Sequence, residues 1–329
     1  MSFWKDLKRT CLAKGRPFFI LAPMDDVTDV VFREVITWTG KPDVFFSEFT
    51  NVDGLNSKGR EKLIQRFKFS ENQRPIVAQL WGKVPENYFK AARDVKELMF
   101  DGIDLNMGCP ERSVLKSGNC AALINNQSLA KDIIQATIKG GGGLPVSVKT
   151  RLGFDRYQGD EWFPFLLNLD LAAITVHGRT AREMSKVPAN WEEIGKVVKI
   201  RDQINPNILI IGNGDVIDIK HGEKLSKKYG VDGVMIGRGI FRNPWIFNKT
   251  QKKHSKEERL NLALKHARLF VETWGVDKNI NILNKFFKIY VSGFDGAAEL
   301  RVKLMEAKSF EEIEKYLGVE SCSNSLKSF

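Results

Sequence analysis

The 329-residue chain has few of the residues that build metal centres or disulfide frameworks. It contains four histidines and four cysteines, and the cysteines form no CxxC pair and no metal-ligand spacing with the histidines. A disulfide scaffold and a zinc module are therefore excluded. Cysteines used in this way are typical of reduced thiols, so we expect a cytoplasmic protein. The four are Cys11, Cys109, Cys120 and Cys322.

Long hydrophobic runs are also missing. No stretch reaches the roughly 18 consecutive apolar residues of a membrane span, and residues 1–6 contain no apolar run of signal-peptide length. We therefore expect neither a membrane span nor a secretory leader. The dinucleotide fingerprint GxGxxG is absent too, because residues 237–242 begin like the motif and fail at its last position.

The composition indicates a folded protein with a basic surface. Hydrophobic residues make up 43% of the chain and charged residues 28%, which is enough for a sizeable core and argues against disorder. The formal net charge is +11. Such an excess is compatible with a polyanionic partner such as nucleic acid, and equally with a surplus of lysine that serves solubility alone.

Short apolar runs alternate with helical patterns over the first 240 residues. The runs are continuous in their apolar character, as in strands that are buried on both faces of a parallel sheet. Eight such units predict a (β/α)8 TIM barrel, with a doubly wound sheet as the alternative. The predicted strands are 18–23, 44–49, 75–82, 102–109, 145–153, 172–178, 207–215 and 233–239. The predicted helices are 29–39, 86–100, 128–139, 160–169, 191–201 and 217–229.

The character of the chain changes after Trp245. Residues 247–329 contain no convincing strand, and apolar residues recur at helical spacing in 256–274, 280–292, 296–307 and 310–317. We therefore expect two domains, a barrel over 1–246 and an all-helical C-terminal domain over 247–329. Residues 249–329 hold 15 Lys and Arg against 11 Asp and Glu, so the tail holds part of the basic excess.

Cys109 lies at the end of a predicted strand, in the sequence Asn106-Met107-Gly108-Cys109-Pro110. Barrel enzymes build their active sites from the carboxyl ends of their strands, so this is a position for chemistry. A thiol there can act as a nucleophile or a proton donor. The alternative is a small buried residue that packs, which is the usual fate of a free cysteine.

Other polar side chains stand at the ends of other predicted strands. A lysine that points into a barrel mouth rarely packs there without an anionic partner. Each of these residues taken singly could be a strand end that reaches solvent, but several together favour a site. They are Gln79, Asn106, Lys149 and His177.

The last two predicted strands end in glycine-rich turns, at 212–215 and 237–239. Backbone N–H groups in such turns close on phosphate, and barrels commonly bind phosphate at this position. Arg238 would add a charged clamp. The alternative is a pair of ordinary turns. A phosphate site with one lysine, one glutamine and no metal cluster suits flavin mononucleotide (FMN), although the residues alone leave several kinds of FMN barrel open.

Six motifs, in order along the chain, resemble those of the tRNA-dihydrouridine synthases. The resemblance covers about residues 18–247. The motifs are 22–29 with Phe32-Arg33, 104–110 with 114–123, 148–151, 177–180, 213–215 and 237–239. The helical tail also agrees with that family's two-domain plan, which implies an FMN-binding catalytic domain over 1–246 and a tRNA-binding helical domain over 247–329.

This resemblance implies an FMN-dependent reduction of the uridine C5–C6 double bond in tRNA, with NADPH or NADH as the electron donor. It makes Cys109 the general acid at C5, while reduced flavin delivers hydride to C6. It assigns Arg179 to the cofactor or the RNA. The cofactor-binding residues it implies are Pro23, Met24, Gln79, Asn106, Lys149, His177, Asn213, Gly214, Asp215, Gly237 and Arg238.

Two other functions stay open at this stage. One is an FMN barrel that reduces a free pyrimidine or an enone, although a small substrate needs no basic helical domain. The other is an RNA-binding protein without catalysis, although Cys109, Lys149 and His177 are all present. We interpret Cys120 as a packing residue on the same loop as Cys109, and we expect a monomer.

Overall fold

The computed structural model describes residues 3–250 and 252–318; Cys322 lies outside them. The chain forms two compact units, Met1–Gly239 and Ile240–Phe329. The sequence analysis placed a boundary later, after residue 246, and its assignment of a catalytic and an RNA-binding domain stays a prediction.

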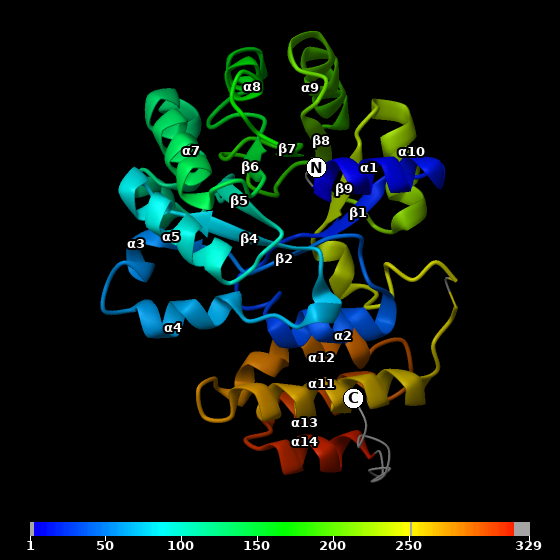
Figure 1. Cartoon of the computed structure of the whole chain (residues 1–329). Coiled ribbons are helices and arrows are strands. Elements are labelled where there is room, and N and C mark those ends of the chain that lie inside the picture. The colour runs from blue at the N-terminus through cyan, green and yellow to red at the C-terminus, as the bar shows by residue number, and fades with distance from the viewer. Residues whose placement is uncertain (1–2, 251, 319–329) are drawn as a thin grey trace. The chain divides into compact units, whose positions relative to one another are not determined.

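Parallel strands close into a barrel in the first unit (Figure 1). Their order is β1-β9-β8-β7-β6-β5-β4-β2, and a bridge between Ile20 and Val44 joins the two ends of this path. The predicted TIM barrel is therefore confirmed, and an open doubly wound sheet is ruled out. The strands are β1 Phe18–Leu21, β2 Phe45–Phe46, β4 Ile76–Trp81, β5 Gly102–Met107, β6 Val146–Arg151, β7 Ala173–His177, β8 Leu209–Asn213 and β9 Gly233–Ile236, and the short β3 Thr50–Asn51 pairs with the end of β4.

Helices follow the strands and surround the barrel (Figure 1). Several start at a polar cap: Asn126 accepts a hydrogen bond from the N–H of Leu129, and Asp218 accepts one from the N–H of His221. The helices are α2 Val30–Gly40, α5 Pro85–Glu97, α7 Gln127–Gly141, α8 Gly159–Leu167, α9 Trp191–Ile204 and α10 Ile219–Tyr229. Shorter helices lie in the connections: α3 Val52–Leu55, α4 Arg60–Ile64, η1 Gln65–Phe67, η2 Glu71–Gln73, α6 Arg112–Lys116, η3 Cys120–Asn125 and η4 Arg238–Phe241.

Most predicted strands are longer than those observed, because their last residues already turn into loops. The predicted strand 102–109 ends at Met107, which leaves Cys109 in the loop. The predicted strand 44–49 shrinks to Phe45–Phe46. The predicted helix 86–100 ends at Glu97, since Met99 adopts a left-handed backbone with φ of 59°.

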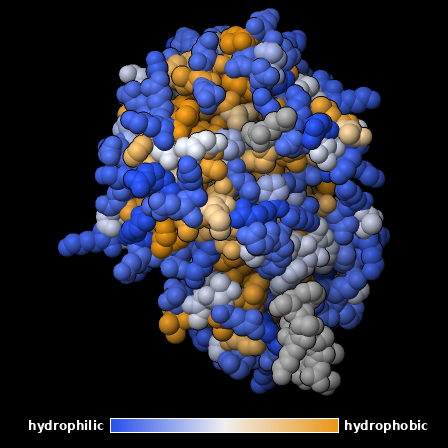
Figure 2. All heavy atoms as spheres, viewed as in Figure 1, coloured by the Kyte–Doolittle hydropathy of each residue, from blue (hydrophilic) through white to orange (hydrophobic). Residues whose placement is uncertain are grey.

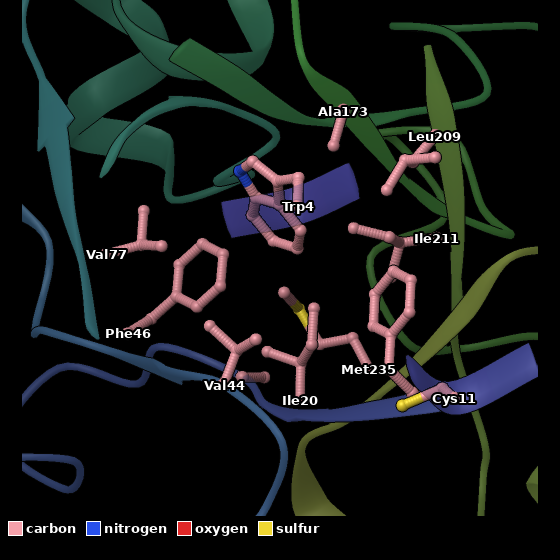
Figure 3. Close-up of a cluster of buried hydrophobic side chains, with 12 residues drawn as sticks. Trp4, Cys11, Ile20, Val44, Phe46, Val77, Ala173, Leu209, Ile211 and Met235 are labelled. Carbon is pink, nitrogen blue, oxygen red and sulfur yellow. The ribbon is translucent and has the colours of Figure 1, made fainter. Parts of the chain in front are cut away.

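An N-terminal helix, α1 Phe3–Ala13, was not predicted. Its Trp4 side chain is 1% exposed and lies among apolar side chains from the strands (Figure 3). The buried cluster comprises Trp4, Cys11, Phe18, Ile20, Ala22, Val44, Phe46, Val77, Ala173, Leu209, Ile211 and Met235. Helix α1 is therefore part of the barrel core rather than an appended segment.

The interior of the barrel changes from apolar to polar along the strands. Side chains two positions apart on a strand share a face. Val77 belongs to the apolar cluster, so Gln79 faces the same interior further along β4, and Ala173 places Thr175 and His177 there on β7. The polar half lies toward the carboxyl ends of the strands, where the predicted site residues stand.

The second unit is all-helical over its described residues. Its helices are α11 Lys256–Trp274, η5 Ile280–Leu283, α12 Asn284–Tyr290, α13 Ala297–Glu306 and α14 Phe310–Leu317. Ser255 and Glu258 form a capping box that starts α11. The predicted helix 280–292 is divided between η5 and α12, and His266 hydrogen bonds to the hydroxyl of Tyr290 (2.9 Å) inside the unit.

Hydrophilic residues dominate the face of the molecule shown in Figure 2, with hydrophobic residues scattered among them. Over the described ranges, no helix has both the length and the hydropathy that a membrane crossing requires. This agrees with the absence of long apolar runs in the sequence.

Candidate active site

Five of the polar strand-end residues are neighbours across the sheet. Asn106 of β5 is in register with Lys149 of β6, Arg151 of β6 with His177 of β7, and His177 with Asn213 of β8. Neighbouring parallel strands lie about 4.8 Å apart. The structure therefore brings these residues together at one end of the barrel.

The loop that carries Cys109 is held from two sides. The Oδ1 atom of Asn106 accepts hydrogen bonds from the N–H groups of Gly108 (3.1 Å) and Cys109 (3.0 Å). From β6, the Nε atom of Arg151 donates to the carbonyl oxygen of Gly108 (2.6 Å). At Gly108 the strand backbone passes close by, since a Cβ there would lie 3.3 Å from the backbone of Lys149 and Thr150, which would have to shift slightly. The position of Cys109 is thus fixed by the barrel strands.

The Cys109 thiol lies in surroundings that favour its charged form. A hydrogen bond from the side chain of Cys120 is the main cause that lowers the pKa of Cys109 to about 6, with Arg151 and Lys149 adding positive charge. Cys120 itself is 1% exposed, and the pKa of its own thiol is raised well above the usual value. Cys120 is buried, as predicted, but it also contacts Cys109.

Lys149 brings positive charge to the barrel mouth. Burial lowers the pKa of its ammonium group to about 8, and the nearby Arg151 contributes to this shift. Over residues 3–250 and 252–318, its Nζ atom makes neither a hydrogen bond nor an ion pair. Thr175, its register neighbour on β7, has a buried hydroxyl that also finds no hydrogen-bond partner in the same ranges. These two unpaired groups suit a polar ligand.

The turn after β8 approaches its neighbours closely. Gly214 has φ of 129°, and a Cβ atom there would lie 2.6 Å from the Cβ of Ala189. The side chain of Asn213 donates to the carbonyl oxygen of Met235 on β9 (2.9 Å), and Trp191 donates to the carbonyl of Gly214 (2.9 Å). The turn is therefore fixed by side chains from outside it.

Arg179 and Asp215 tie this turn to the loop after β7. Arg179 is 2% exposed and donates to the carboxylate of Asp215 (2.5 Å) and to the carbonyl of Val187 (2.6 Å), and it contacts the ring of His177 (3.0 Å). Partial burial opposes the shift, but the hydrogen bond from Arg179 lowers the pKa of Asp215. The role predicted for Arg179 at the cofactor or the RNA stays a prediction, since its donors are used within the protein.

Burial keeps His177 neutral. It lowers the pKa of the His177 ring well below its usual value, and the positive charges of Lys149 and Arg151 act in the same direction. A neutral imidazole offers one donor and one acceptor. Because the Nε2 atom of His177 accepts from Arg179, the Nδ1–H group is the one left to donate to a ligand, without adding to the charge of the site.

The ends of β1 and β9 complete the barrel mouth. The N–H of Ala22 donates to the carbonyl of Ile236 (2.9 Å), so Pro23 and Met24 follow β1 directly beside the turn that carries Gly237 and Arg238. Met24 starts a turn of its own, in which its N–H donates to the hydroxyl of Thr28 (2.9 Å). Arg238 is exposed and reaches Asp215 (3.4 Å).

Comparison with known proteins now decides the family. The family model described as "Dihydrouridine synthase (Dus)" matches residues 20–326. The chain belongs to the dihydrouridine synthase family. It is similar to the "Probable tRNA-dihydrouridine synthase 2" of Bacillus subtilis (strain 168), with 46% identity over 319 residues that cover 96% of this chain and 95% of the relative. It is also 46% identical over 316 residues to the "Probable tRNA-dihydrouridine synthase" of Staphylococcus aureus (strain COL). This match covers 94% of this chain and 93% of that relative.

Solved structures share the barrel fold of this dihydrouridine synthase family member at low sequence identity. Histamine dehydrogenase from Rhizobium sp. 4-9 superposes with a TM-score of 0.55 at 12% identity, over 76% of this chain and 48% of that one. Morphinone reductase superposes with a TM-score of 0.50 at 12% identity, over 70% of this chain and 84% of that one. These likenesses concern the fold alone.

Sequence reasoning missed several residues of this dihydrouridine synthase site. Arg151 stood in a recognised motif but was given no role, although it holds the Cys109 loop. Asp104, Ser147 and Thr175 lie on the interior face of their strands and were counted as parts of apolar runs. The signal was available, because each lies two residues from a predicted site residue on the same strand.

Proposed function

We propose that this protein reduces the C5–C6 double bond of a uridine in tRNA and so forms 5,6-dihydrouridine. The support is its membership of the dihydrouridine synthase family, together with the names of relatives that match almost its whole length. The observation that carries the proposal is Cys109, a thiol held by Asn106 and Arg151 at the active end of a TIM barrel. A thiol so placed can give a proton to a substrate bound over the barrel mouth.

FMN fits the groups that the barrel mouth offers. The unpaired ammonium of Lys149 and the unpaired hydroxyl of Thr175 are matched to an electron-rich ring edge. The turns after β8 and β9 provide backbone N–H groups and the exposed Arg238 for a phosphate. We propose that FMN is held by Pro23, Met24, Gln79, Asn106, Lys149, His177, Asn213, Gly214, Asp215, Gly237 and Arg238. Asp215 would contribute through its backbone, because Arg179 occupies its carboxylate.

Bound FMN in its reduced form supplies the hydride that C6 of the uracil receives. The protein supplies the proton, since C5 becomes basic only when hydride reaches C6. The protonated form of Cys109 donates from its Sγ atom to C5, and its pKa of about 6 makes that thiol a strong proton donor. Asn106 keeps the loop that carries this thiol in place. The Cys120 thiol, hydrogen-bonded to Cys109, then stabilises the thiolate that is left. Lys149 would hold the anionic edge of the cofactor.

The substrate base must leave the RNA stack to reach such a site, which costs a few kcal/mol. Contacts between phosphates and basic side chains offset that cost. We propose that residues 247–329 serve the RNA, that Arg179 acts on the cofactor side through its contacts with Asp215 and His177, and that NADPH or NADH reduces the flavin. The monomeric state and the cytoplasmic location stay predictions.

The test is the dihydrouridine content of unmodified tRNA after incubation with the full-length protein, FMN and NADPH, measured by nucleoside mass spectrometry. New dihydrouridine in the tRNA supports the proposal. Equal turnover of free uridine would instead indicate a reductase of small molecules. RNA binding by a protein that takes up no flavin would indicate an RNA-binding function without catalysis.

A further inference from the structure

A buried carboxylate lies below the active site in the middle of β5. Asp104 is 0% exposed and is in register with Gln79 of β4 on one side and with Ser147 of β6 on the other. Burial raises the pKa of Asp104 to about 6. In the structure both oxygens of Asp104 accept hydrogen bonds, as the oxygens of an ionised carboxylate do.

This acceptor decides the orientation of the Gln79 amide. The Nε2 atom of Gln79 donates to Oδ2 of Asp104 (2.7 Å), while the hydroxyl of Ser147 donates to Oδ1 (2.6 Å). An amide has its donor and its acceptor on opposite sides. With Nε2 directed at Asp104, the Oε1 atom of Gln79 is directed at Asn106, from whose Nδ2 atom it accepts a hydrogen bond (3.2 Å).

The orientation of Asn106 follows in turn. Because its Nδ2 atom donates to Gln79, its Oδ1 atom is left facing the loop, where it accepts from the N–H groups of Gly108 and Cys109. A reversed Gln79 would oppose its own N–H₂ to that of Asn106. A reversed Asn106 would oppose a donor to the two backbone N–H groups, and the Cys109 loop would lose both hydrogen bonds.

We propose that Asp104 is a positioning residue, which fixes the direction of the chain Asp104–Gln79–Asn106 and thereby holds the backbone of Cys109 in place. The inference rests on the proposed function for the role of Cys109, but the position of the thiol is measurable without it. Asp104 acts through other residues: its described hydrogen bonds are to Gln79 and Ser147.

Three variants separate the hydrogen bond from the charge. Asp104→Leu keeps a similar shape and removes both acceptors, and Asp104→Val is a second apolar variant suited to a strand in case leucine does not fold. Asp104→Asn removes the charge but keeps one acceptor for Gln79, since Ser147 can receive the new N–H₂ group. Asp232→Asn is the matched control. It alters a carboxylate just before β9, which is bonded to Arg201, Lys8 and the N–H of Ile210 and takes no part in this chain of amides.

The first readout is alkylation of Cys109 by iodoacetamide in the full-length protein between about pH 5 and about pH 9, followed by peptide mass spectrometry. The second is kcat and KM for tRNA. The alkylation midpoint is the pH at which the alkylation rate of Cys109 is half its maximum, and in the apolar variants we expect this pH to rise. We also expect kcat to fall by about tenfold, while KM for tRNA changes by less than about threefold. Asp104→Asn and Asp232→Asn are expected to keep the wild-type midpoint.

Two results would overturn the inference. One is a folded apolar variant with the wild-type midpoint and kcat. The other is an Asp104→Asn variant whose midpoint and kcat change as much as those of the apolar variants, which would assign the effect to the charge of Asp104. A wild-type protein that makes no dihydrouridine would count against the proposed function alone, because the alkylation midpoints would still report whether Asp104 positions Cys109.

Discussion

The side chain of Cys120 is hydrogen-bonded to the sulfur of Cys109, and this contact is the main cause of the lowered pKa of Cys109. Cys120 reaches that position from a left-handed backbone conformation with φ of 51°, at the start of η3. An L-residue with a side chain rarely adopts this conformation. The barrel therefore holds two thiols in contact at its active end.

Replacing Cys120 by alanine removes the hydrogen bond to Cys109. We expect the apparent pKa of Cys109 to rise from about 6 toward the usual value for cysteine, because the thiolate loses its donor. The same pH would then leave more of Cys109 protonated. The rate of iodoacetamide modification at Cys109, followed against pH, measures this shift. Cys120→Ser keeps a donor and serves as the control, and an unchanged midpoint in the alanine variant would contradict the assignment.

Lys149→Ala is expected to weaken FMN binding by about tenfold, through loss of a positive charge in a partly buried site. The wild-type affinity should also depend on pH. The pKa of Lys149 is about 8, so the ammonium charge that favours an anionic cofactor is present below that pH and lost as the pH rises through it. Fluorescence titration of FMN over this range tests both statements. Lys131→Ala, at an exposed position on α7, is the control. Equal FMN affinities of the two variants would show that Lys149 does not bind the cofactor.

Arg151→Met is expected to destabilise the protein by about 3 kcal/mol, since buried carbonyl groups would lose their donor. In the native structure Arg151 donates to the carbonyls of Gly108, Thr180 and Met184. The free energy of unfolding in urea measures the effect. The exposed Arg156→Met variant should stay close to wild type. Equal stability of both variants would show that Arg151 does not tie these loops together.

Trp4→Ala is expected to cost about 3–5 kcal/mol of stability, the usual range for removing a large aromatic side chain from a core. Trp4 is 1% exposed among the strand side chains of Figure 3. Leu12, on the same helix, is 62% exposed, so Leu12→Ala should have little effect. Thermal unfolding of the two variants tests whether α1 belongs to the barrel core, and similar melting temperatures would argue that it does not.

The sequence predicted the barrel and its active end because both depend on short-range patterns. Continuous apolar runs indicate buried parallel strands, and a polar residue at the end of such a run, such as Lys149 or His177, lies at the active edge whatever its partners are. In the structure Lys149 is in register with Asn106, and His177 lies on the next strand of the same edge.

Other features depend on contacts that no local pattern contains. The two-residue period of a strand puts Asp104 on the same face as Asn106, but only the closed barrel sets Gln79 and Ser147 beside it. The contact between Cys120 and Cys109 requires an unusual backbone angle. Helix α1 has an apolar spacing at Trp4, Leu7 and Cys11 that indicates a helix, but the sequence analysis predicted no element there and no leader.

The most direct test of the account is the turnover of Cys109→Ala on unmodified tRNA, with flavin reduction by NADPH followed in the same sample. We predict that FMN binding and flavin reduction persist while dihydrouridine formation falls by at least about 100-fold, because only the proton donor to C5 is lost. Dihydrouridine formation at the wild-type rate in this variant would contradict the central claim, and would show that the proton comes from another group.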